Sequence, residues 1–223
     1  MKPVSLVYFL VVVAIALGST SCVSRSQFDR VEGQKSALEI KEARLTKEVA
    51  TLKLANRGLA ESLTASATEN VAMRNTYDQL LIELEGEVES GQIEVQQLID
   101  GIQLNVSDKL LFASGSAALN EVGIDLIRRV AEKIKDERAV IDVEGHTDSE
   151  QIGPALRKLY PTNWELAGAR ASSVVRQLSQ DGVPPSRLRS VSRGPFDPIA
   201  SNDTAEGRAK NRRTEIVLRL LPQ

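Results

Sequence analysis

The stretch that decides the fold is AVIDVEGHTD, residues 139–148. Two apolar residues, Ile141 and Val143, alternate there with acidic ones, which is the period-two pattern of a half-buried strand. A glycine ends the strand, and His146-Thr147-Asp148 follow it in a loop. Polar side chains at the end of a strand are positioned by a rigid scaffold and often form sites. We therefore expect a candidate site directly after this strand.

Patterns on both sides of this strand predict one small α+β domain, residues 102–223. Its expected elements, in chain order, are strand 102–112, helix 119–134, the strand described above, helix 163–181, strand 188–191 and strand 215–220. Asn163 is expected to cap the second helix. Two helices covering one face of a four-stranded mixed sheet would give a β-α-β-α-β-β sandwich.

A long helical spacer is expected before this domain, over residues 22–101. Residues 24–101 contain no proline and are rich in Ala, Leu, Glu, Lys and Gln, which favour helix. Apolar residues recur every seven positions at Val31, Leu38, Leu45, Leu52 and Leu59, with Phe28, Val49 and Leu63 at the second heptad position. A second register contains Tyr77, Leu81, Leu84, Val88, Val95, Leu98 and Ile102. The pattern predicts a coiled coil or a helical hairpin, either within a homo-oligomer or with an envelope partner.

Polar residues and glycines interrupt this repeat. Lys35, Glu42 and Asn56 occupy one of the two apolar heptad positions, and breaks are expected at Gly58, Gly86 and Gly91. A loosely helical linker is therefore the alternative to a coiled coil.

The N-terminus has the layout of an export signal. Lys2 precedes an uncharged apolar run, residues 4–17, and a cluster of small residues then leads to Cys22. The run is shorter than the roughly 20 residues that span a bilayer, so a cleaved signal peptide over residues 1–21 is expected. The position of Cys22 resembles a bacterial lipobox, which implies lipidation of Cys22 and sorting to the outer membrane. An ordinary cleaved signal or an uncleaved membrane anchor is the alternative.

Composition excludes several kinds of site. The net charge of -2 gives no support for nucleic-acid binding. With one cysteine and one histidine, no intrachain disulfide can form and a multi-ligand zinc site lacks ligands, so neither a metal nor a cofactor is expected. The basic run at residues 208–213 is interpreted as a solvated or structural surface rather than a nucleic-acid patch.

Four motifs in the C-terminal half resemble those of one family. They are FASGS at 112–116, VEGHTD at 143–148, NWELAGARA at 163–171 and NDTAEGRAKNRRTEI at 202–216. In this order they resemble the OmpA C-terminal-like peptidoglycan-binding domain, which is shared with the peptidoglycan-associated lipoprotein and the flagellar stator B subunit. The resemblance spans nearly all of residues 102–221 and implies binding of peptidoglycan without catalysis.

The resemblance also implies a ligand and a set of binding residues. The ligand is the diaminopimelate of the peptidoglycan stem, which carries an ammonium beside a carboxylate. Asp148 would face the ammonium, and Arg170 would face the carboxylate through its planar fork. The remaining binding residues implied are Thr147, Asn163, Asn202, Arg208 and Arg212. The alternative from the residues alone is that Asp148 and Arg170 pair only with each other.

Two other functional classes stay open at this point. An enzyme is conceivable because His146 precedes Asp148 by two residues, but no nucleophile motif such as G-x-S-x-G supports one. The other is an envelope assembly or scaffold protein that acts through its coiled coil, with an OmpA-like domain that does not bind ligand. Trp164 is expected to be a packing residue rather than a platform for sugar.

Overall fold

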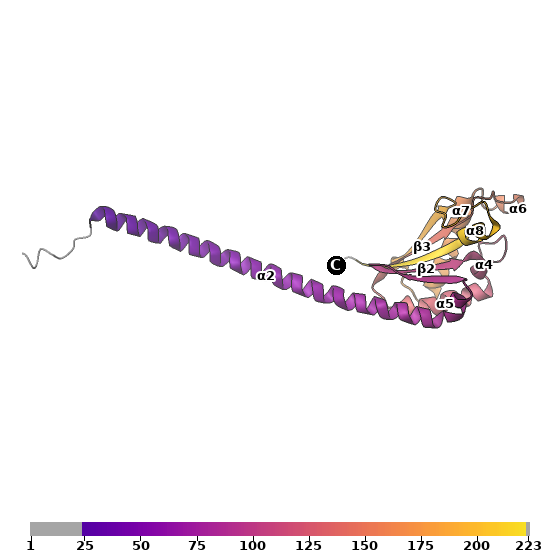
Figure 1. The fold of residues 1–223 in the computed structure, drawn as a ribbon, viewed down its shortest axis with the longest axis horizontal. Helices are drawn as coiled ribbons and strands as arrows, with labels where there is room; N and C mark the ends of the chain where they lie inside the picture. The colour runs from indigo at the N-terminus through magenta and orange to yellow at the C-terminus, as the bar shows by residue number, and fades with distance from the viewer. Residues whose placement is uncertain (1–23, 222–223) are drawn as a thin grey trace, which may run out of the picture. The chain divides into compact units, whose positions relative to one another are not determined.

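The structure is a computed structural model that describes residues 24–221 (Figure 1). Its elements are α2 (Arg25–Glu83), α3 (Glu85–Glu89), β1 (Ile93–Gln97), β2 (Gly101–Ser107), α4 (Asp108–Leu111), α5 (Glu121–Ile134), β3 (Ala139–His146), α6 (Pro154–Arg157), α7 (Asn163–Gln180), a 3-10 turn η1 (Pro185–Arg187), β4 (Leu188–Gly194), α8 (Ala205–Asn211) and β5 (Arg213–Leu220). The expected signal peptide and the expected lipidation of Cys22 lie outside the described residues.

The sheet has five strands among the described residues, in the order β1-β2-β5-β3-β4. β5 pairs antiparallel with both β2 and β3, and β3 pairs parallel with β4. The strand predicted from the alternation at residues 141–144 is therefore β3, a central strand of the sheet. Since β3 lies between β5 and β4, its end at His146 opens beside the start of β5 and the end of β4.

Strand β1 corrects the predicted extent of the helical spacer. Residues 93–97 form an antiparallel hairpin with β2, in which Ile93 and Val95 are buried. The second heptad register therefore does not continue as a helix through Val95, Leu98 and Ile102. Gly91, at φ 67°, makes the turn that ends the helical part, as expected.

Helix α2 is continuous through Gly58, so the break expected there is wrong, and so is a hairpin within residues 25–83. Gly86 likewise lies inside a helix, α3. The end of α2 packs into the core of the C-terminal unit, where Met73, Leu80 and Leu84 are buried. Part of the second heptad register is thus intrachain packing rather than a coiled-coil seam.

The side of α5 that faces the core is apolar, and the helix contacts the end of α2. Leu126, Ile127 and Val130 of α5 are almost fully buried. Arg129 Nη1 donates a hydrogen bond of 2.9 Å to the backbone oxygen of Glu83. Figure 1 shows α5 beside this end of α2.

Two local predictions need correction. Residues 108–111 form the short helix α4 instead of extending the first strand, although Phe112 makes a single bridge with Leu119. Thr162, not Asn163, caps α7: it forms a capping box with Glu165. The Asn163 amide is engaged elsewhere, as described below.

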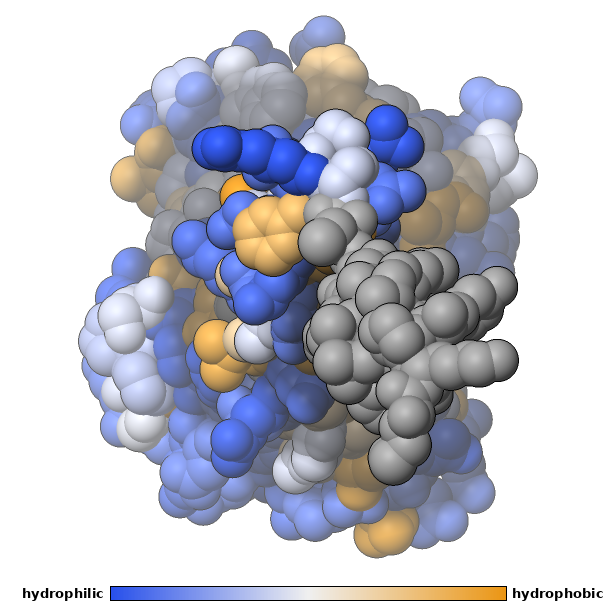
Figure 2. Space-filling view, turned by 90° about the vertical axis from the view of Figure 1, so that its left-hand side faces the viewer, coloured by the Kyte–Doolittle hydropathy of each residue, from blue (hydrophilic) through white to orange (hydrophobic). Residues whose placement is uncertain are grey.

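The described chain divides into residues 24–61, where every residue is exposed, and residues 62–221, which hold the core. On the face shown in Figure 2, hydrophilic side chains predominate and hydrophobic ones occur in small separate groups. Within residues 24–221, no helix combines the length and hydropathy needed to cross a bilayer.

Candidate ligand-binding site

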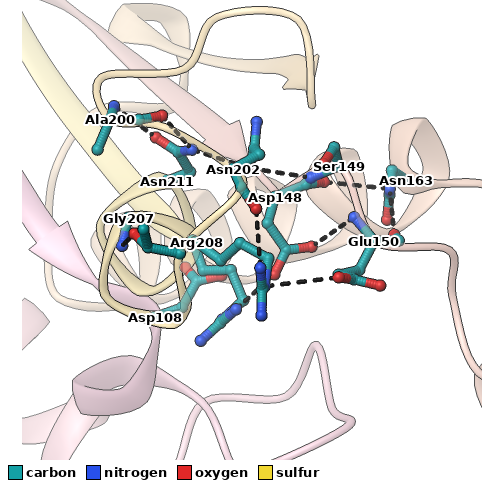
Figure 3. Close-up of polar contacts among 12 residues, drawn as sticks. Asp108, Asp148, Ser149, Glu150, Asn163, Ala200, Asn202, Gly207, Arg208 and Asn211 are labelled. Carbon is teal, nitrogen blue, oxygen red and sulfur yellow. Dashed lines mark hydrogen bonds and ion pairs between the residues drawn. The ribbon is translucent and has the colours of Figure 1, made fainter.

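The candidate site lies at the end of β3 (Figure 3). The loop after β3, the first turn of α7 and the loop before α8 contribute its side chains. Thr147 and Asp148 directly follow β3 and are both buried. Asn163 comes from the first turn of α7, and Asn202 from the loop before α8. Segments more than 50 residues apart in the sequence thus supply one cluster of polar side chains.

Asp148 is held from two directions. Its Oδ2 accepts a hydrogen bond from Arg212 Nη1, which also makes an ion pair with it, and its Oδ1 accepts one of 3.1 Å from the Glu150 amide. The Asp148 side chain is only 10% exposed. A carboxylate offers about four acceptor positions, so the two bonds fix its orientation and leave acceptor capacity.

Asn202 ties the loop before α8 to the loop after β3. Its Oδ1 accepts hydrogen bonds from the Ser149 amide at 3.3 Å and from Asn211 Nδ2 at 2.9 Å. Asn211 is fully buried and also binds the backbone of Ile199 and Ala200. Because every polar atom of the Asn211 amide group is satisfied, the loop has a fixed shape.

Arg208 lies on α8 across from Glu150. Its Nη1 donates a hydrogen bond of 2.8 Å to the Asn202 carbonyl, and its Nε lies 3.5 Å from Glu150 Oε1. The side chain of Glu150 is 67% exposed, so this ion pair contributes little to stability.

Arg170 is buried and has a different acidic partner from the one considered in the sequence. Its Nη1 lies 2.5 Å from Asp108 Oδ2, and its Nε donates to the Ser116 carbonyl at 3.1 Å. The guanidinium also lies over the Phe112 ring, 5.2 Å from the ring centroid, a cation-π contact. Asp148 and Arg170 are therefore each paired with another residue, and the alternative that they pair only with each other is wrong.

Asp108 is a residue of this site that the sequence reasoning missed. It follows β2, is 5% exposed, and accepts a further hydrogen bond from Thr214 Oγ1 at 3.2 Å. Burial raises the pKa of Asp108 to about 6, while the charges of Arg170 and Arg212 act in the opposite direction. The available signal was an acidic residue directly after a buried strand, the same signal that singled out Asp148.

Asn163 and Thr147 complete the site. Asn163 Nδ2 donates to the backbone oxygens of Asp148 at 3.3 Å and Glu150 at 2.9 Å, so it fixes the loop from the first turn of α7. The Thr147 hydroxyl is buried and has no hydrogen-bond partner among the described residues. An unpaired buried hydroxyl is costly, which makes it a candidate contact for a ligand.

Glu144, His146 and Glu215 form a second buried cluster, with ligand atoms within 4.8 Å of one another. Both carboxylates already have guanidinium partners: Arg193 Nε lies 2.5 Å from Glu144, and Arg213 Nε lies 2.7 Å from Glu215. Two guanidinium charges at this distance disfavour a metal cation. The cluster is best described as a buried network of ion pairs.

His146 does not form the pair that a serine hydrolase needs. It is 1% exposed, and neither ring nitrogen has a hydrogen-bond partner in residues 24–221. Burial and then the charge of Arg213 lower its pKa to about 4, so the ring is neutral near pH 7. Within residues 24–221 no serine hydroxyl forms a hydrogen bond with this imidazole.

Trp164 is not a core residue, contrary to expectation. It is 47% exposed and stacks on Phe196, which is 71% exposed, with ring centroids 5.2 Å apart. Gly194, at φ 57°, allows this contact because a Cβ there would lie 3.3 Å from the Trp164 ring.

Comparisons with known proteins agree with this fold. Residues 111–212 match the OmpA family. The chain is 39% identical to "Probable lipoprotein YiaD" of Escherichia coli over 56% of this chain and 55% of that protein. It is 37% identical to "Peptidoglycan-binding protein ArfA" of Mycobacterium tuberculosis over 49% of this chain and 32% of that protein. The matched region thus spans about half, or less, of these relatives.

A solved structure extends the likeness to most of the fold of the C-terminal unit. The cell wall anchor of the T6SS from Pseudomonas aeruginosa superimposes with a TM-score of 0.59 at 30% identity, covering 64% of this chain and 97% of that one. The sequence motifs, the sheet and the comparisons agree that residues 111–212 form an OmpA-family domain.

Proposed function

We propose that this protein binds peptidoglycan without catalysis, through the diaminopimelate of the stem peptide, and so tethers a membrane of the cell envelope to the cell wall. The observation that carries the proposal is a pair of buried, opposite charges in fixed positions, Asp148 after β3 and Arg170 on α7. Each is oriented by its own partner within the chain.

The two charges suit a ligand that carries an ammonium beside a carboxylate. Asp148 retains acceptor capacity for the ammonium after its bonds to Arg212 and the Glu150 amide. For Arg170, no bond of Nη2 is found in the described part of the chain, while Nε and Nη1 are occupied. The bonds of Nε and Nη1 fix the plane of the guanidinium, and Nη2 keeps N–H donors that can bind a carboxylate.

The other site residues support the same ligand. The Thr147 hydroxyl lacks a partner among the residues described, and a ligand could supply one. Arg212 stands between the two acids, since it pairs with Asp148 and also lowers the pKa of Asp108. Hydrogen bonds of Arg208, Asn202 and Asn163 hold the loops around the site.

The names of relatives support the cell wall as the partner. ArfA is named as a peptidoglycan-binding protein, the Pseudomonas structure as a cell wall anchor, and YiaD as a lipoprotein. By the same reasoning Cys22 would carry the lipid anchor, and the protein would face the periplasm from the outer membrane.

One observation favours a second candidate function. The charges of Asp148 and Arg170 are already compensated inside the chain, and a site of this kind can be purely structural. The protein would then be an envelope scaffold that acts through α2, with an OmpA domain that does not bind ligand.

Co-sedimentation with purified sacculi distinguishes the two. The full chain in mild detergent is expected to sediment with sacculi in a saturable manner, and Asp148→Ala and Arg170→Ala are each expected to abolish this. The matched controls are Asp142→Ala and Arg219→Ala, because Asp142 is a similarly buried acid on β3 whose pair with Arg219 lies outside the site. Wild-type protein that stays in the supernatant would support the scaffold function instead.

A further inference from the structure

Residues 28–59 of α2 carry an apolar stripe that nothing in the described chain covers. Its members, the heptad seam, are Phe28, Val31, Leu38, Leu45, Val49, Leu52 and Leu59. Their side chains are between 48% and 64% exposed. Lys35, Glu42 and Asn56 interrupt one of its two heptad series, but the other series is apolar throughout. An exposed apolar series of this length on a helix indicates a partner surface.

We propose that the heptad seam pairs with the same segment of a second copy, as a parallel, in-register, two-stranded coiled coil. A second copy supplies a matching seam by symmetry. This assignment is independent of peptidoglycan binding.

The shape of the helix surface fits this pairing. A hollow on α2 is lined by Leu38, Lys41, Glu42, Leu45, Thr46 and Val49. In a parallel two-stranded coil each seam side chain inserts among four residues of the facing helix. Leu38, Lys41, Glu42 and Leu45 would form the set of four that receives Glu42 of the second copy. The next set, which would receive Leu45 of the second copy, shares Glu42 and Leu45 and adds Thr46 and Val49. The two sets together are the six residues of the hollow.

Charges across the pair favour the parallel register. Glu48 would face Lys53 of the second copy at the two positions that flank the seam, and symmetry makes this contact twice. Glu42 would contact Lys41 of the second copy inside the hollow described above. The charge of Lys35 is offset within its own helix by Glu39, 3.8 Å away.

Residue types in the seam favour two strands. Leucine fills four of the five positions of one heptad series, and β-branched Val49 occupies one position of the other series. Leucine in the first series with a β-branched residue in the second is the combination preferred in dimers. Asn56 also lies in the second series, where a buried asparagine specifies register and oligomer state at a cost in stability. Gly33 and Gly58 lie on outward positions, where nothing lies within 4 Å of the site of a Cβ.

Cysteine crosslinking in the native envelope tests this arrangement, because Cys22 is the only cysteine of the chain. Leu38→Cys and Leu52→Cys are introduced separately into the full chain, and cells are oxidised before non-reducing electrophoresis. Lys47→Cys is the outward-facing control, and the wild-type chain gives the background due to Cys22. Facing seam positions lie within disulfide reach, whereas outward positions do not.

Both seam variants are expected to run mostly at twice the mass of one chain, with Lys47→Cys at the wild-type background. Adding Leu45→Asp to Leu38→Cys is expected to abolish the dimer band, whereas Lys47→Asp leaves it. Two results would overturn the proposal. One is crosslinking of the seam variants no greater than that of Lys47→Cys. The other is a dimer formed only when the Leu38→Cys and Leu52→Cys chains are expressed together, which indicates an antiparallel pair.

Discussion

At the scale of single residues, Asp108 is the main addition of the structure to the candidate site. It accepts bonds from Arg170 and Thr214 while almost fully buried, so it compensates the charge of Arg170. Sequence motifs identified Asp148 and Arg170 because the family pattern includes them. They did not identify Asp108, because its partners on α7 and β5 are 62 and 106 residues away.

Loss of this partner is expected to be costly. Asp108→Ala leaves the Arg170 guanidinium buried and uncompensated, so we expect the free energy of unfolding to fall by about 3 to 5 kcal/mol. Denaturant titration measures it. The control is Asp125→Ala, which removes an exposed pair with Arg128 and a second pair with Arg129, and should cost about 1 kcal/mol or less. Equal effects of the two changes would contradict this role of Asp108.

The buried imidazole of His146 predicts a pH dependence of stability. Its folded pKa of about 4 lies below the unfolded value of 6.5, so the unfolded chain takes up a proton first as the pH falls. Relative to His146→Gln, the wild type should therefore lose up to about 3 kcal/mol between about pH 6.5 and pH 4. The pKa of Asp108 is raised, so its protonation changes the free energy of unfolding in the opposite direction as the pH falls. Both proteins contain Asp108, so this contribution cancels when they are compared. If the free energies of unfolding of the two proteins changed in parallel with pH, the imidazole would not be desolvated in the folded protein.

At the scale of elements, β3 and α7 were predictable and β1 was not. Residues 141–144 alternate strictly and residues 163–180 have an apolar helical side, so each pattern has one interpretation. Within residues 93–97, Val95 fits both the heptad register and an alternating strand, whereas Ile93 fits only the strand. Only pairing with β2, a tertiary contact, selects the strand.

The close packing of β3 against α7 gives a test at this scale. A Cβ at Gly145 would lie 2.1 Å from the Ala167 carbonyl oxygen, so Gly145→Ala must push the helix away from the strand. We expect the free energy of unfolding to fall by about 3 kcal/mol. At Gly168, on the same helix, the nearest atom to an added Cβ is at 3.6 Å, so Gly168→Ala should be neutral or stabilising. Thermal unfolding of both variants checks the contrast.

At the scale of the whole molecule, the folded C-terminal unit begins before the family motif does. The match to the OmpA family starts at residue 111, yet Leu80 and Leu84 are fully buried in the same core. A sequence boundary at residue 102 would remove β1 and the end of α2. The heptad pattern concealed this, because helix packing and coiled-coil pairing use the same spacing.

Two fragments test where the unit begins. Residues 62–223 should unfold cooperatively, whereas residues 102–223 should be less stable by about 5 kcal/mol or more, because several large buried side chains lose their partners. Circular dichroism with denaturant measures both fragments. Equal stability would place the end of α2 outside the core.

Recognition of the stem peptide is the central claim, and calorimetry of the full chain with two stem peptides, one carrying diaminopimelate and one carrying lysine at the same position, tests it most directly. Within the peptide the lysine side chain keeps the free ammonium but has no carboxylate beside it, so it removes the partner assigned to Arg170 and keeps the partner assigned to Asp148. We expect saturable binding of the diaminopimelate peptide, at least about tenfold weaker binding of the lysine peptide, which corresponds to 1.4 kcal/mol, and no binding of the diaminopimelate peptide to Asp148→Ala or Arg170→Ala. Equal affinity for the two peptides, or no binding of either to the wild type, would contradict the central claim.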